Sequence, residues 1–366
     1  MSVLRCAPKA ANGDHMSKRV DEEINEELSR AEKNERCCTP ESAARRRAMR
    51  GRNDAIIEPI AGLFARRETW GKLNPSERTL WLMRGLAGRH EDWTFCGASA
   101  AVAYGLPVTW DMLTHVFVSV PQGTRGGSSP GIARRHLKDD EGFELGDLRI
   151  TSLWRTVFDC LATFPAADAL AIVDRAARLS AASARQVVEY LRTAHRGGRH
   201  VRRAIEVAAL ADGRAESGGE SIARHVMHEL GFAAPELQVW IEDPVEPGKW
   251  FRVDFLWLLP DGSVIIGELD GRQKSERPEL MGGRSAVRVL QDERLRESHL
   301  TALRPAIVRF DYETARDPAR LGPLLESYGV PRRTRETALP PATRTVNAHL
   351  EYIGGWRVLA TDEVLA

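Results

Sequence analysis

Residues 251–274 read FRVDFLWLLPDGSVIIGELDGRQK, and this stretch determines how the C-terminal half of the chain is interpreted. Two apolar runs of strand length, 251–259 and 264–269, flank a Pro-Asp-Gly turn at 260–262. The second run is almost continuously apolar, which is typical of a strand that is buried on both faces of a sheet. The stretch therefore predicts a β-hairpin whose second strand is central.

Carboxylates interrupt both of these apolar runs. Asp254 lies in the first run and Glu268 in the second, and Asp270 shares a strand face with Glu268, because alternate residues of a strand point the same way. Burying a charge in such a strand is costly unless the charge is paired or bound to a metal. Carboxylate oxygens and water are the ligands that Mg²⁺ prefers. We therefore expect Asp254, Glu268 and Asp270 to bind Mg²⁺ or Mn²⁺ at one end of the hairpin.

Three further polar residues are candidates for the same site. Glu220 lies in the first turn of a helix expected over 216–230, and Gln238 lies in the extended segment between that helix and the hairpin. Lys274 lies four residues after Asp270. We expect Glu220 to assist the metal ligands, and Lys274 to orient a water molecule or to stabilise negative charge on a scissile phosphate.

The carboxylates also have simpler interpretations. Asp254 could be an exposed strand residue that pairs with Arg252, and Glu268 with Asp270 could form a strand end before a turn. An acidic residue such as Glu220 stabilises the first turn of a helix through the helix dipole. The metal site and these structural roles therefore remain alternatives at this point.

The order of elements in residues 213–330 is helix, hairpin, helix, strand. The second helix is expected over 286–303 and the last strand over 306–310. This order predicts an α/β/α domain, with a sheet between helices. The tail at 331–366 is rich in Arg, Thr and Pro, and we assign it no structure.

This pattern resembles the PD-(D/E)XK nuclease superfamily, and in particular the branch related to very-short-patch-repair endonucleases, whose second strand reads E-x-D-G-x-x-H. Here that strand reads Glu-Leu-Asp-Gly-Arg-Gln-Lys over 268–274, and the first strand supplies Val-Asp-Phe at 253–255. The resemblance covers about residues 220–330 and implies a restriction-endonuclease-like fold with metal-dependent cleavage of DNA. Asp270 stands where the superfamily usually has lysine, and Lys274 replaces the histidine of this branch. Metal binding is therefore better supported than cleavage.

The front half of the chain predicts a mixture of helices and strands. Thr39, followed by proline, is expected to cap one helix, and Asn74 is expected to cap another over 76–86. A strand is expected over 115–120, and apolar residues recur at helical spacing between 153 and 210. This part of the chain is therefore expected to be an α+β region that becomes helical toward its end.

A cluster of arginines follows Thr39 on the first of these helices. It consists of Arg45, Arg46, Arg47, Arg50 and Arg52. Because arginine guanidinium groups contact DNA phosphates, this cluster is our candidate DNA-binding surface. A solvated helix face is the alternative interpretation.

Three segments of the front half are similar to the middle domain of the type IV abortive-infection antitoxin family. They read FCGASAA at 95–101, YGLP at 104–107 and TSLWRTVFD at 151–159. In that family a winged-helix-like N-terminal part binds promoter DNA, and related proteins often carry a nuclease-like C-terminal domain. The resemblance covers about residues 40–210. It implies a DNA-binding winged-helix-like segment followed by the middle domain, ahead of the nuclease-like domain.

These patterns together predict five parts. They are a flexible arm (1–39), a degenerate winged-helix-like segment (40–92), an α+β antitoxin-like middle domain (93–212), a PD-(D/E)XK nuclease-like α/β/α domain (213–330) and a tail (331–366).

The composition excludes several classes of protein. The chain has 366 residues, 43% apolar and 28% charged, which is typical of a globular protein with two or three domains. No apolar run approaches the roughly 20 residues of a membrane-spanning helix, and the N-terminal residues lack the apolar segment of a secretory signal. The 52 Lys and Arg residues nearly balance the 51 Asp and Glu residues, so a DNA-binding surface must be a local patch. Five scattered cysteines favour a reducing cytoplasm over a disulfide framework or a zinc site.

The sequence therefore predicts a cytoplasmic, DNA-acting protein. The first hypothesis is a Mg²⁺-dependent endonuclease whose N-terminal region targets it to DNA. The alternative is a non-catalytic, DNA-binding transcriptional regulator of the type IV antitoxin kind, with a cognate toxin as a further partner. The two hypotheses share one architecture and differ in whether the carboxylates at 254 and 268 perform chemistry.

Overall fold

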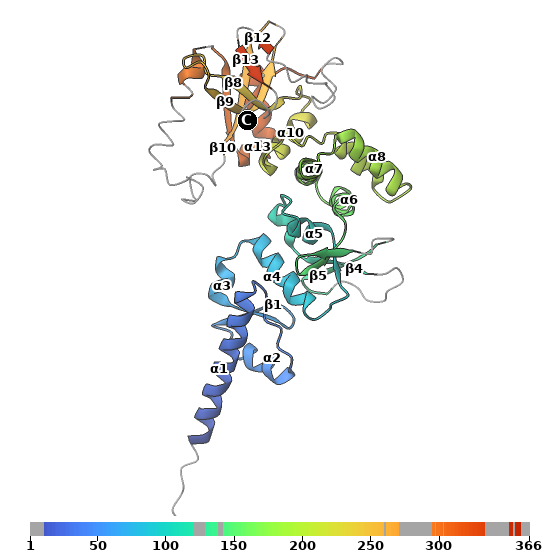
Figure 1. Cartoon of the computed structure of the whole chain (residues 1–366), viewed down its shortest axis with the longest axis vertical. Helices are drawn as coiled ribbons and strands as arrows, with labels where there is room; N and C mark the ends of the chain where they lie inside the picture. The colour runs from blue at the N-terminus through green and yellow to red at the C-terminus, as the bar shows by residue number, and fades with distance from the viewer. Residues whose placement is uncertain are drawn as a thin grey trace, which may run out of the picture. The chain divides into compact units, whose positions relative to one another are not determined.

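The computed structural model describes residues 11–120, 129–137, 142–259, 261–270, 295–296, 298–302, 304–333, 351–353 and 356–359. These residues form a mixed α/β structure with three sheets (Figure 1). The chain divides into two compact units, Met1–Thr156 and Val157–Ala366, and each is described by itself. Every helix within the described ranges is either too short or too polar to span a bilayer. The five-part division of the sequence remains a prediction.

The first unit contains most of the short elements of the chain. They are α1 (Ala11–Lys33), α2 (Ala43–Arg50), β1 (Ile56–Ile60), β2 (Leu63–Arg66), α3 (Arg67–Lys72), α4 (Pro75–Ala87), β3 (Thr94–Phe95), α5 (Gly97–Ala103), the 3₁₀ helix η1 (Trp110–Leu113), β4 (Val116–Val120), β5 (Ile132–His136), β6 (Phe143–Leu145) and β7 (Leu148–Ile150). Strands β1 and β2 form a two-stranded sheet, and the other five form a sheet in the order β5-β4-β3-β7-β6. The strand predicted over 115–120 is confirmed as β4. Its Val118 is buried with Phe95 and Ile150 in the core of this unit.

Two helix starts in this unit bear on the sequence predictions. Helix α4 begins as predicted, because Asn74 and Glu77 form a reciprocal capping box. Helix α2 is capped by Ser42, whose hydroxyl accepts a hydrogen bond from the backbone N–H of Arg45 at 3.0 Å. The prediction that Thr39 caps this helix is wrong, since the helix begins too late for Thr39 to reach the free N–H groups of its first turn.

The segment expected to be a flexible arm contributes to a core. Ile24 and Leu28 of α1 are each 1% exposed, and they pack in one cluster with Met49 and Phe64. The spacing of four residues places Ile24 and Leu28 on one face of the helix. Helix α1 is therefore packed along this apolar face rather than loosely attached.

The second unit begins within α6 (Leu153–Thr163) and holds the predicted nuclease-like region. Its further elements are α7 (Ala166–Ser180), α8 (Ala184–Ala194), α9 (Val201–Ala208), α10 (Gly218–Glu229), β8 (Glu236–Glu242), β9 (Trp250–Leu258), β10 (Val264–Asp270), β11 (Ala306–Asp311), α13 (Tyr312–Ala315), α14 (Pro318–Ser327), β12 (Glu351–Ile353) and β13 (Trp356–Leu359). The helical periodicity between 153 and 210 is thus confirmed as α6 to α9.

A six-stranded sheet forms the centre of this unit, in the order β11-β10-β9-β8-β13-β12. The predicted hairpin is confirmed, because β9 and β10 pair antiparallel with Ile266 opposite Leu256. Strand β10 lies between β9 and the parallel strand β11, and its residues from Val264 to Gly267 are buried. The expectation that β10 is a central strand is therefore correct.

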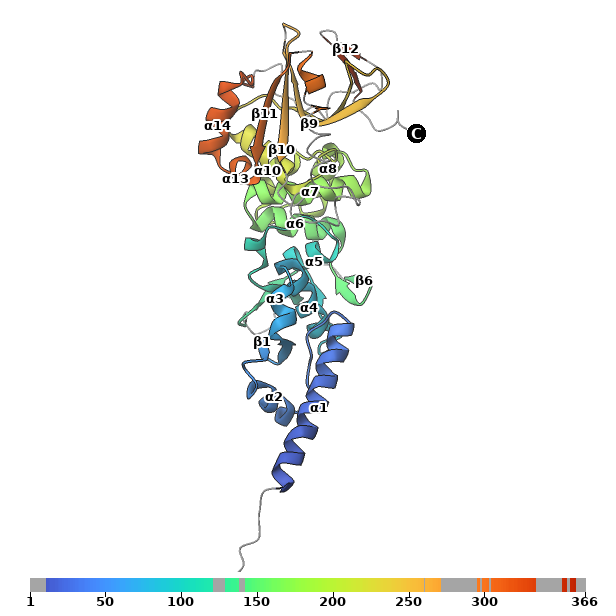
Figure 2. The ribbon, with the colours of Figure 1, turned by 90° about the vertical axis from the view of Figure 1, so that its left-hand side faces the viewer.

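Apolar residues cover both faces of this sheet. On one face Phe255, Ile265 and Phe310 pack with residues of α10 and α14 (Figure 2). On the other face Leu256 and Ile266 pack with Leu300. The helix expected over 286–303 falls partly outside the described residues, and its described part is helical at 295–296 and 298–301.

The assignment of no structure to the tail is wrong for part of it. Strands β12 and β13 pair antiparallel, and β13 pairs with β8, with Val358 opposite Ile241. An isolated pair of short strands is marginally stable, but pairing to an existing sheet edge satisfies the backbone groups of both. The partner strand β8 lies more than a hundred residues before β13 in the sequence, so the tail sequence alone does not reveal this pairing.

Candidate functional site

The structure brings together four of the polar residues that the sequence predicts. Glu220 comes from the first turn of α10, Gln238 from β8, Asp254 from β9 and Glu268 from β10. Lys274 lies outside the described residues, and its predicted role remains a prediction. The site is therefore formed by one helix and three adjacent strands.

Two glycines beside the site leave room for side chains of β9 and β10. A Cβ atom at Gly267 would lie 3.0 Å from the Cβ of Phe255, and one at Gly219 would lie 2.6 Å from Cδ2 of Leu269. Glycine at 267 allows β9 and β10 to approach just before Glu268. Glycine at 219 allows the first turn of α10 to lie against β10.

The backbone ladder between β9 and β10 ends at the site. The last paired residues are Gly267 and Phe255, so Glu268 and Asp254 are next to each other at the point where pairing stops. Instead of a backbone carbonyl, Oδ2 of Asp254 accepts the hydrogen bond from the N–H of Leu269 at 2.9 Å. Asp254 is therefore held in place by the strand that carries Glu268.

Gln238 interrupts the ladder on the other side of β9. The paired residues of β8 and β9 include Leu237 with Phe255 and Val239 with Val253, but not Gln238 with Asp254. The first pair belongs to the core that α10 covers, whereas the second pair belongs to the core on the opposite face. Leu237 and Val239 would share a face in a regular strand, but here they point to opposite faces of the sheet, and the same holds for residues 253 and 255 of β9.

The backbone of Gln238 is in the left-handed region, with φ of 52°. Such a conformation is unfavourable for a residue with a side chain, by roughly 1–2 kcal/mol, and strained residues of this kind are frequent at functional sites. Its Nε2 donates hydrogen bonds to Oε2 of Glu220 at 2.9 Å and to Oδ1 of Asp254 at 3.3 Å. One amide therefore bridges two carboxylates.

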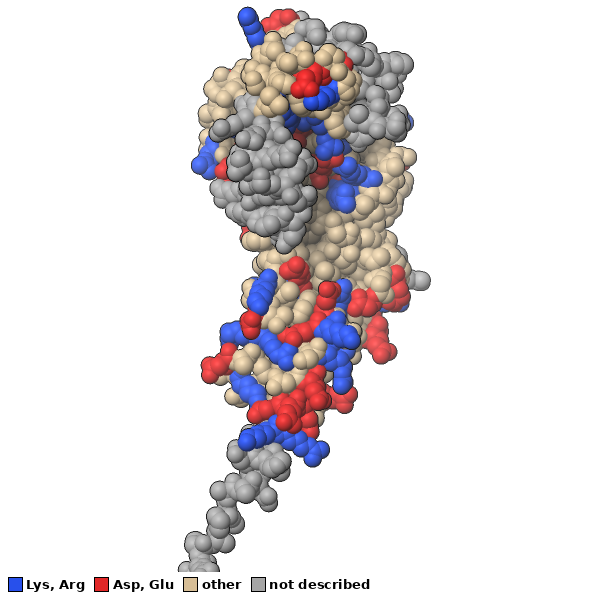
Figure 3. Space-filling model, turned by 60° about the vertical axis from the view of Figure 1, so that its left-hand side comes forward, with Lys and Arg blue, Asp and Glu red and all other residues tan. Residues whose placement is uncertain are grey.

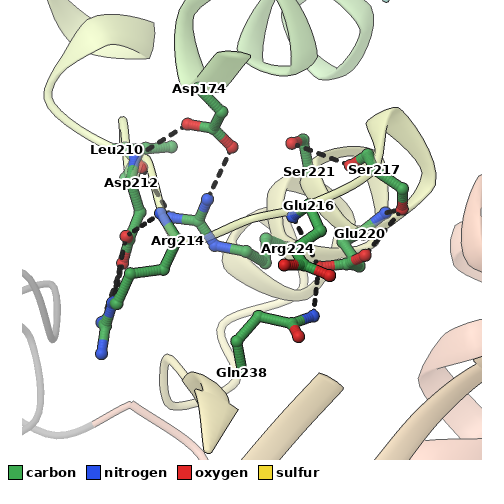
Figure 4. Close-up of polar contacts among 10 residues, drawn as sticks. All are labelled: Asp174, Leu210, Asp212, Arg214, Glu216, Ser217, Glu220, Ser221, Arg224 and Gln238. Atoms are coloured by element: carbon green, nitrogen blue, oxygen red, sulfur yellow. Dashed lines mark hydrogen bonds and ion pairs between the residues drawn. The ribbon is translucent and has the colours of Figure 1, made fainter. Parts of the chain in front are cut away.

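Glu220 is 5% exposed and is held by further hydrogen bonds. It accepts from the N–H of Glu216 at 3.0 Å and from Oγ of Ser217 at 2.8 Å. Burial and the nearby Asp254 carboxylate raise the pKa of Glu220 above its usual value. Ser217 already caps α10, so stabilisation of the helix N-terminus alone does not account for a buried carboxylate that points toward Gln238 (Figure 4).

Glu268 is paired with an arginine that the sequence analysis did not identify. Nη2 of Arg296 donates to Oε1 of Glu268 at 2.7 Å and to the carbonyl oxygen of Arg252 at 2.5 Å. Burial raises the pKa of Glu268 to about 7, with Asp254 adding to the rise and Arg296 opposing it. Arg296 lies 28 residues after Glu268 on the predicted second helix, and no local spacing connects the two.

Asp270 differs from the other predicted ligands. Its side chain is 56% exposed, and its ion-pair partner is Arg309 on the neighbouring strand, at 3.6 Å. Asp254, for its part, does not pair with Arg252, whose guanidinium binds Glu216 at 2.9 Å. The role of Asp270 as a metal ligand remains a prediction.

A second cluster with metal-ligating atoms lies at the end of β8. Among the described residues, the group whose ligand atoms all lie within 4.8 Å of one another consists of Asp243, Glu246 and His299. Nδ1 of His299 and Oδ2 of Asp243 are 2.8 Å apart, and Glu246 forms an ion pair with Lys249. Burial opposes the charged form of Asp243, but the hydrogen bond with His299 and two backbone N–H groups outweigh it and lower its pKa. These contacts explain the cluster as a hydrogen-bonded pair that fixes His299 to the end of β8.

A buried ion pair supports the helix that carries Glu220. Nη1 of Arg224 on α10 lies 2.7 Å from Oδ2 of Asp174 on α7, and the two side chains are 10% and 1% exposed (Figure 4). Arg224 also donates to the carbonyl of Leu210 at 2.7 Å, and Asp174 accepts from the N–H of Asp212 at 2.8 Å. Burial raises the pKa of Asp174 to about 6, and Arg224 opposes this rise. Helix α10 is therefore fixed on both of its sides, by the sheet and by α7.

The N-terminal arginine cluster is largely engaged by acidic residues. Arg45 pairs with Glu23 and Glu27, Arg50 pairs with Glu58, Arg52 pairs with Asp21, and Arg46 donates to the carbonyl of Pro40. Acidic and basic side chains are interleaved near the N-terminal end of the molecule (Figure 3). The charges of Arg45, Arg50 and Arg52 are thus matched by nearby carboxylates, which agrees with a structural role for these three. DNA binding by it remains a prediction.

The charge balance of the site suits a hard cation. Glu220, Asp254 and Glu268 offer carboxylate oxygens only, which is the ligand type that Mg²⁺ and Mn²⁺ prefer. Within the described residues, Arg296 is the cation in hydrogen-bond contact with this group. Burial is the main cause of the raised pKa values of Glu220 and Glu268, and the Asp254 carboxylate adds to both. Metal binding by Asp254 and Glu268 remains a prediction, and the three carboxylates are not as tightly grouped as the cluster of Asp243, Glu246 and His299.

Comparisons with known proteins identify relatives without a known function. No family model matches the chain, and no solved structure matches it. Two uncharacterized proteins of Mycobacterium tuberculosis, from strains CDC 1551 and H37Rv, are each 45% identical to it over 89 residues. This match covers 24% of the chain and 32% of the relatives, so the chain spans about a third of their length. The interpretation of the site therefore depends on its own geometry.

Proposed function

We propose that residues 213–330, within the second unit, form a restriction-endonuclease-like domain of the PD-(D/E)XK kind and that this domain cleaves DNA in a reaction that depends on Mg²⁺ or Mn²⁺. The observation that carries the proposal is the convergence of Glu220, Asp254 and Glu268 from one helix and two strands, two of them with raised pKa values. Carboxylates that lie close together and have perturbed pKa values are frequent at functional sites.

Each residue has a part in this proposal. Asp254 and Glu268 would hold the cation, which when bound would activate a water molecule and polarise the phosphodiester. Gln238 keeps Asp254 and Glu220 at a fixed separation through its two hydrogen bonds. Glu220 is the supporting carboxylate, which adds to the negative potential that attracts a cation.

Alternative structural roles explain less of the geometry. Asp254 does not form the pair with Arg252 that a simple strand residue would form, and Glu220 is buried although Ser217 already caps its helix. Gln238 links two carboxylates although its backbone lies in the left-handed region. These features together favour a functional site over three incidental acids.

A plasmid-nicking assay tests this function. The full-length protein is incubated with supercoiled DNA and Mg²⁺ or Mn²⁺, beside Asp254→Asn and Glu268→Gln. We expect cleavage by the wild type, a loss of at least about 100-fold in both variants, and no cleavage with EDTA. Equal nicking by the wild type and both variants would refute the proposal. Promoter binding by a wild type that does not nick would instead favour the antitoxin-like regulator.

A further inference from the structure

We propose that Arg296 contacts the scissile phosphate of the DNA substrate, and this inference rests on the proposed nuclease function. The sequence assigns contact with the scissile phosphate to Lys274, the last residue of the motif at 268–274. Arg296 comes from a separate segment of the chain. Arg296 would thus supply the positively charged side chain that the E-x-D sequence of β10 lacks.

The first step is the position of the guanidinium. Arg296 lies within hydrogen-bond distance of Glu268, one of the two proposed metal ligands, and contacts only one of its carboxylate oxygens, Oε1. A phosphate that approaches a cation held by Glu268 therefore comes within reach of the same guanidinium. The side chain is 24% exposed, so it is accessible from outside without being free in solvent.

The second step is how firmly the side chain is placed. Nη2 also donates to the carbonyl of Arg252, and the guanidinium lies 5.9 Å from the ring of Phe251. Three residues further along the chain, Nδ1 of His299 lies 2.8 Å from Oδ2 of Asp243 at the end of β8. The segment that carries Arg296 is therefore attached to the sheet at two points, and the arginine needs little reordering to bind a ligand.

The third step is the donor capacity that remains. Arginine has five N–H donors in a planar fork, and the two contacts of Arg296 both use Nη2. Its Nε is buried and has no hydrogen-bond partner among the described residues, so it does not face an approaching ligand. Neither contact uses Nη1, whose two N–H groups therefore remain for an anion. Arginine is well suited to this role because its guanidinium binds phosphate oxygens through charge-assisted hydrogen bonds.

Salt dependence of DNA binding separates a phosphate contact from a structural role. Each neutralised phosphate contributes about −0.9 to the slope of log K against log salt concentration. We would measure binding of a fluorescein-labelled duplex to the full-length protein in Ca²⁺, over a series of NaCl concentrations, with nicking in Mg²⁺ on the same samples. Arg296→Met removes the charge and the hydrogen bonds. Arg296→Gln keeps a hydrogen-bonding group for Glu268 and decides the question if the Met variant does not fold.

Arg332→Met is the matched control. Arg332 also pairs with a carboxylate, that of Glu326, and lies 4.1 Å from the ring of Phe232, but it is outside the proposed site. The control should bind and nick as the wild type does.

We expect both Arg296 variants to lose about 0.9 from the magnitude of the slope and at least about 100-fold in nicking rate. A wild-type slope in Arg296→Gln would overturn the phosphate contact, whether or not nicking falls. If Asp254→Asn is inactive while Arg296→Gln nicks normally, this inference fails and the nuclease function stands. If Asp254→Asn nicks as the wild type does, the proposed function itself fails.

Discussion

Gln238 lies opposite Asp254 at the position where the ladder between β8 and β9 is interrupted, and its Nε2 is 3.3 Å from Oδ1 of Asp254. The same nitrogen is 2.9 Å from Oε2 of Glu220. The amide therefore holds together two carboxylates that would otherwise repel each other. The left-handed backbone at Gln238 is the local cost of this arrangement.

Two substitutions of Gln238 distinguish the contribution of its amide hydrogen bonds from the cost of its left-handed backbone. Gln238→Ala and Gln238→Gly both remove the amide, which takes one hydrogen bond from the buried Glu220 and one from Asp254 and should destabilise the fold by about 1–3 kcal/mol. Glycine accepts a φ of 52° without strain, so Gln238→Gly should be more stable than Gln238→Ala by about 1 kcal/mol. Urea denaturation of both variants measures the difference. A glycine variant less stable than the alanine variant would contradict the account of the backbone.

The raised pKa of Glu268 predicts a pH-dependent stability. An acid with a folded pKa of about 7 and an ordinary value of 4.5 binds its proton more tightly in the folded protein. Its ionisation therefore lowers the free energy of unfolding as the pH rises from about 4.5 through 7. Glu268→Gln lacks this ionisation and retains an oxygen for Arg296. In EDTA it should match the wild type near pH 4.5 and exceed its stability above pH 7, by an amount on the order of 3 kcal/mol.

Melting temperatures at several pH values test this prediction. The difference between Glu268→Gln and the wild type should grow with pH and level off above pH 7. Mg²⁺ should then stabilise the wild type but not the variant, because a ligand that binds only the folded state raises its stability. A difference that does not depend on pH would show that Glu268 is not a buried acid with a raised pKa.

The buried pair of Asp174 and Arg224 should matter more for stability than an exposed pair. Arg224→Met leaves the buried Asp174 carboxyl without its ion-pair partner, which should cost about 3–5 kcal/mol. Arg332→Met removes a pair whose side chains are about half exposed, and it should cost less than about 1 kcal/mol. Chemical denaturation of the two variants compares them directly. Similar losses would mean that α10 does not depend on its attachment to α7.

Sequence reasoning identified the carboxylates because their signal is local. A charge within an apolar strand is unusual in itself, so Asp254 and Glu268 could be found without knowledge of the fold. The hairpin and the central position of β10 followed from the same apolar runs. Gln238 was placed correctly as a neighbour, but its left-handed backbone has no sequence signature, since glutamine does not favour that conformation.

The contacts that sequence reasoning missed connect residues far apart in the chain. Arg296 meets Glu268 across 28 residues, and Asp174 meets Arg224 across 50. Neither pair is at a spacing that a helix or hairpin creates, so only the tertiary fold reveals them. The acidic partners of Arg45 and Arg52 on α1 likewise lie 22 and 31 residues away in the sequence, so spacing alone does not reveal them.

Calorimetric titration of Mn²⁺ into the full-length protein, beside Asp254→Ala and His299→Ala, tests the central claim most directly. The two variants distinguish the proposed site from the cluster at Asp243. We predict that the wild type and His299→Ala bind the cation and that Asp254→Ala does not. Binding that persists in Asp254→Ala and disappears in His299→Ala would contradict the account, because the cation would then lie at the end of β8 and not among the carboxylates of the proposed active site.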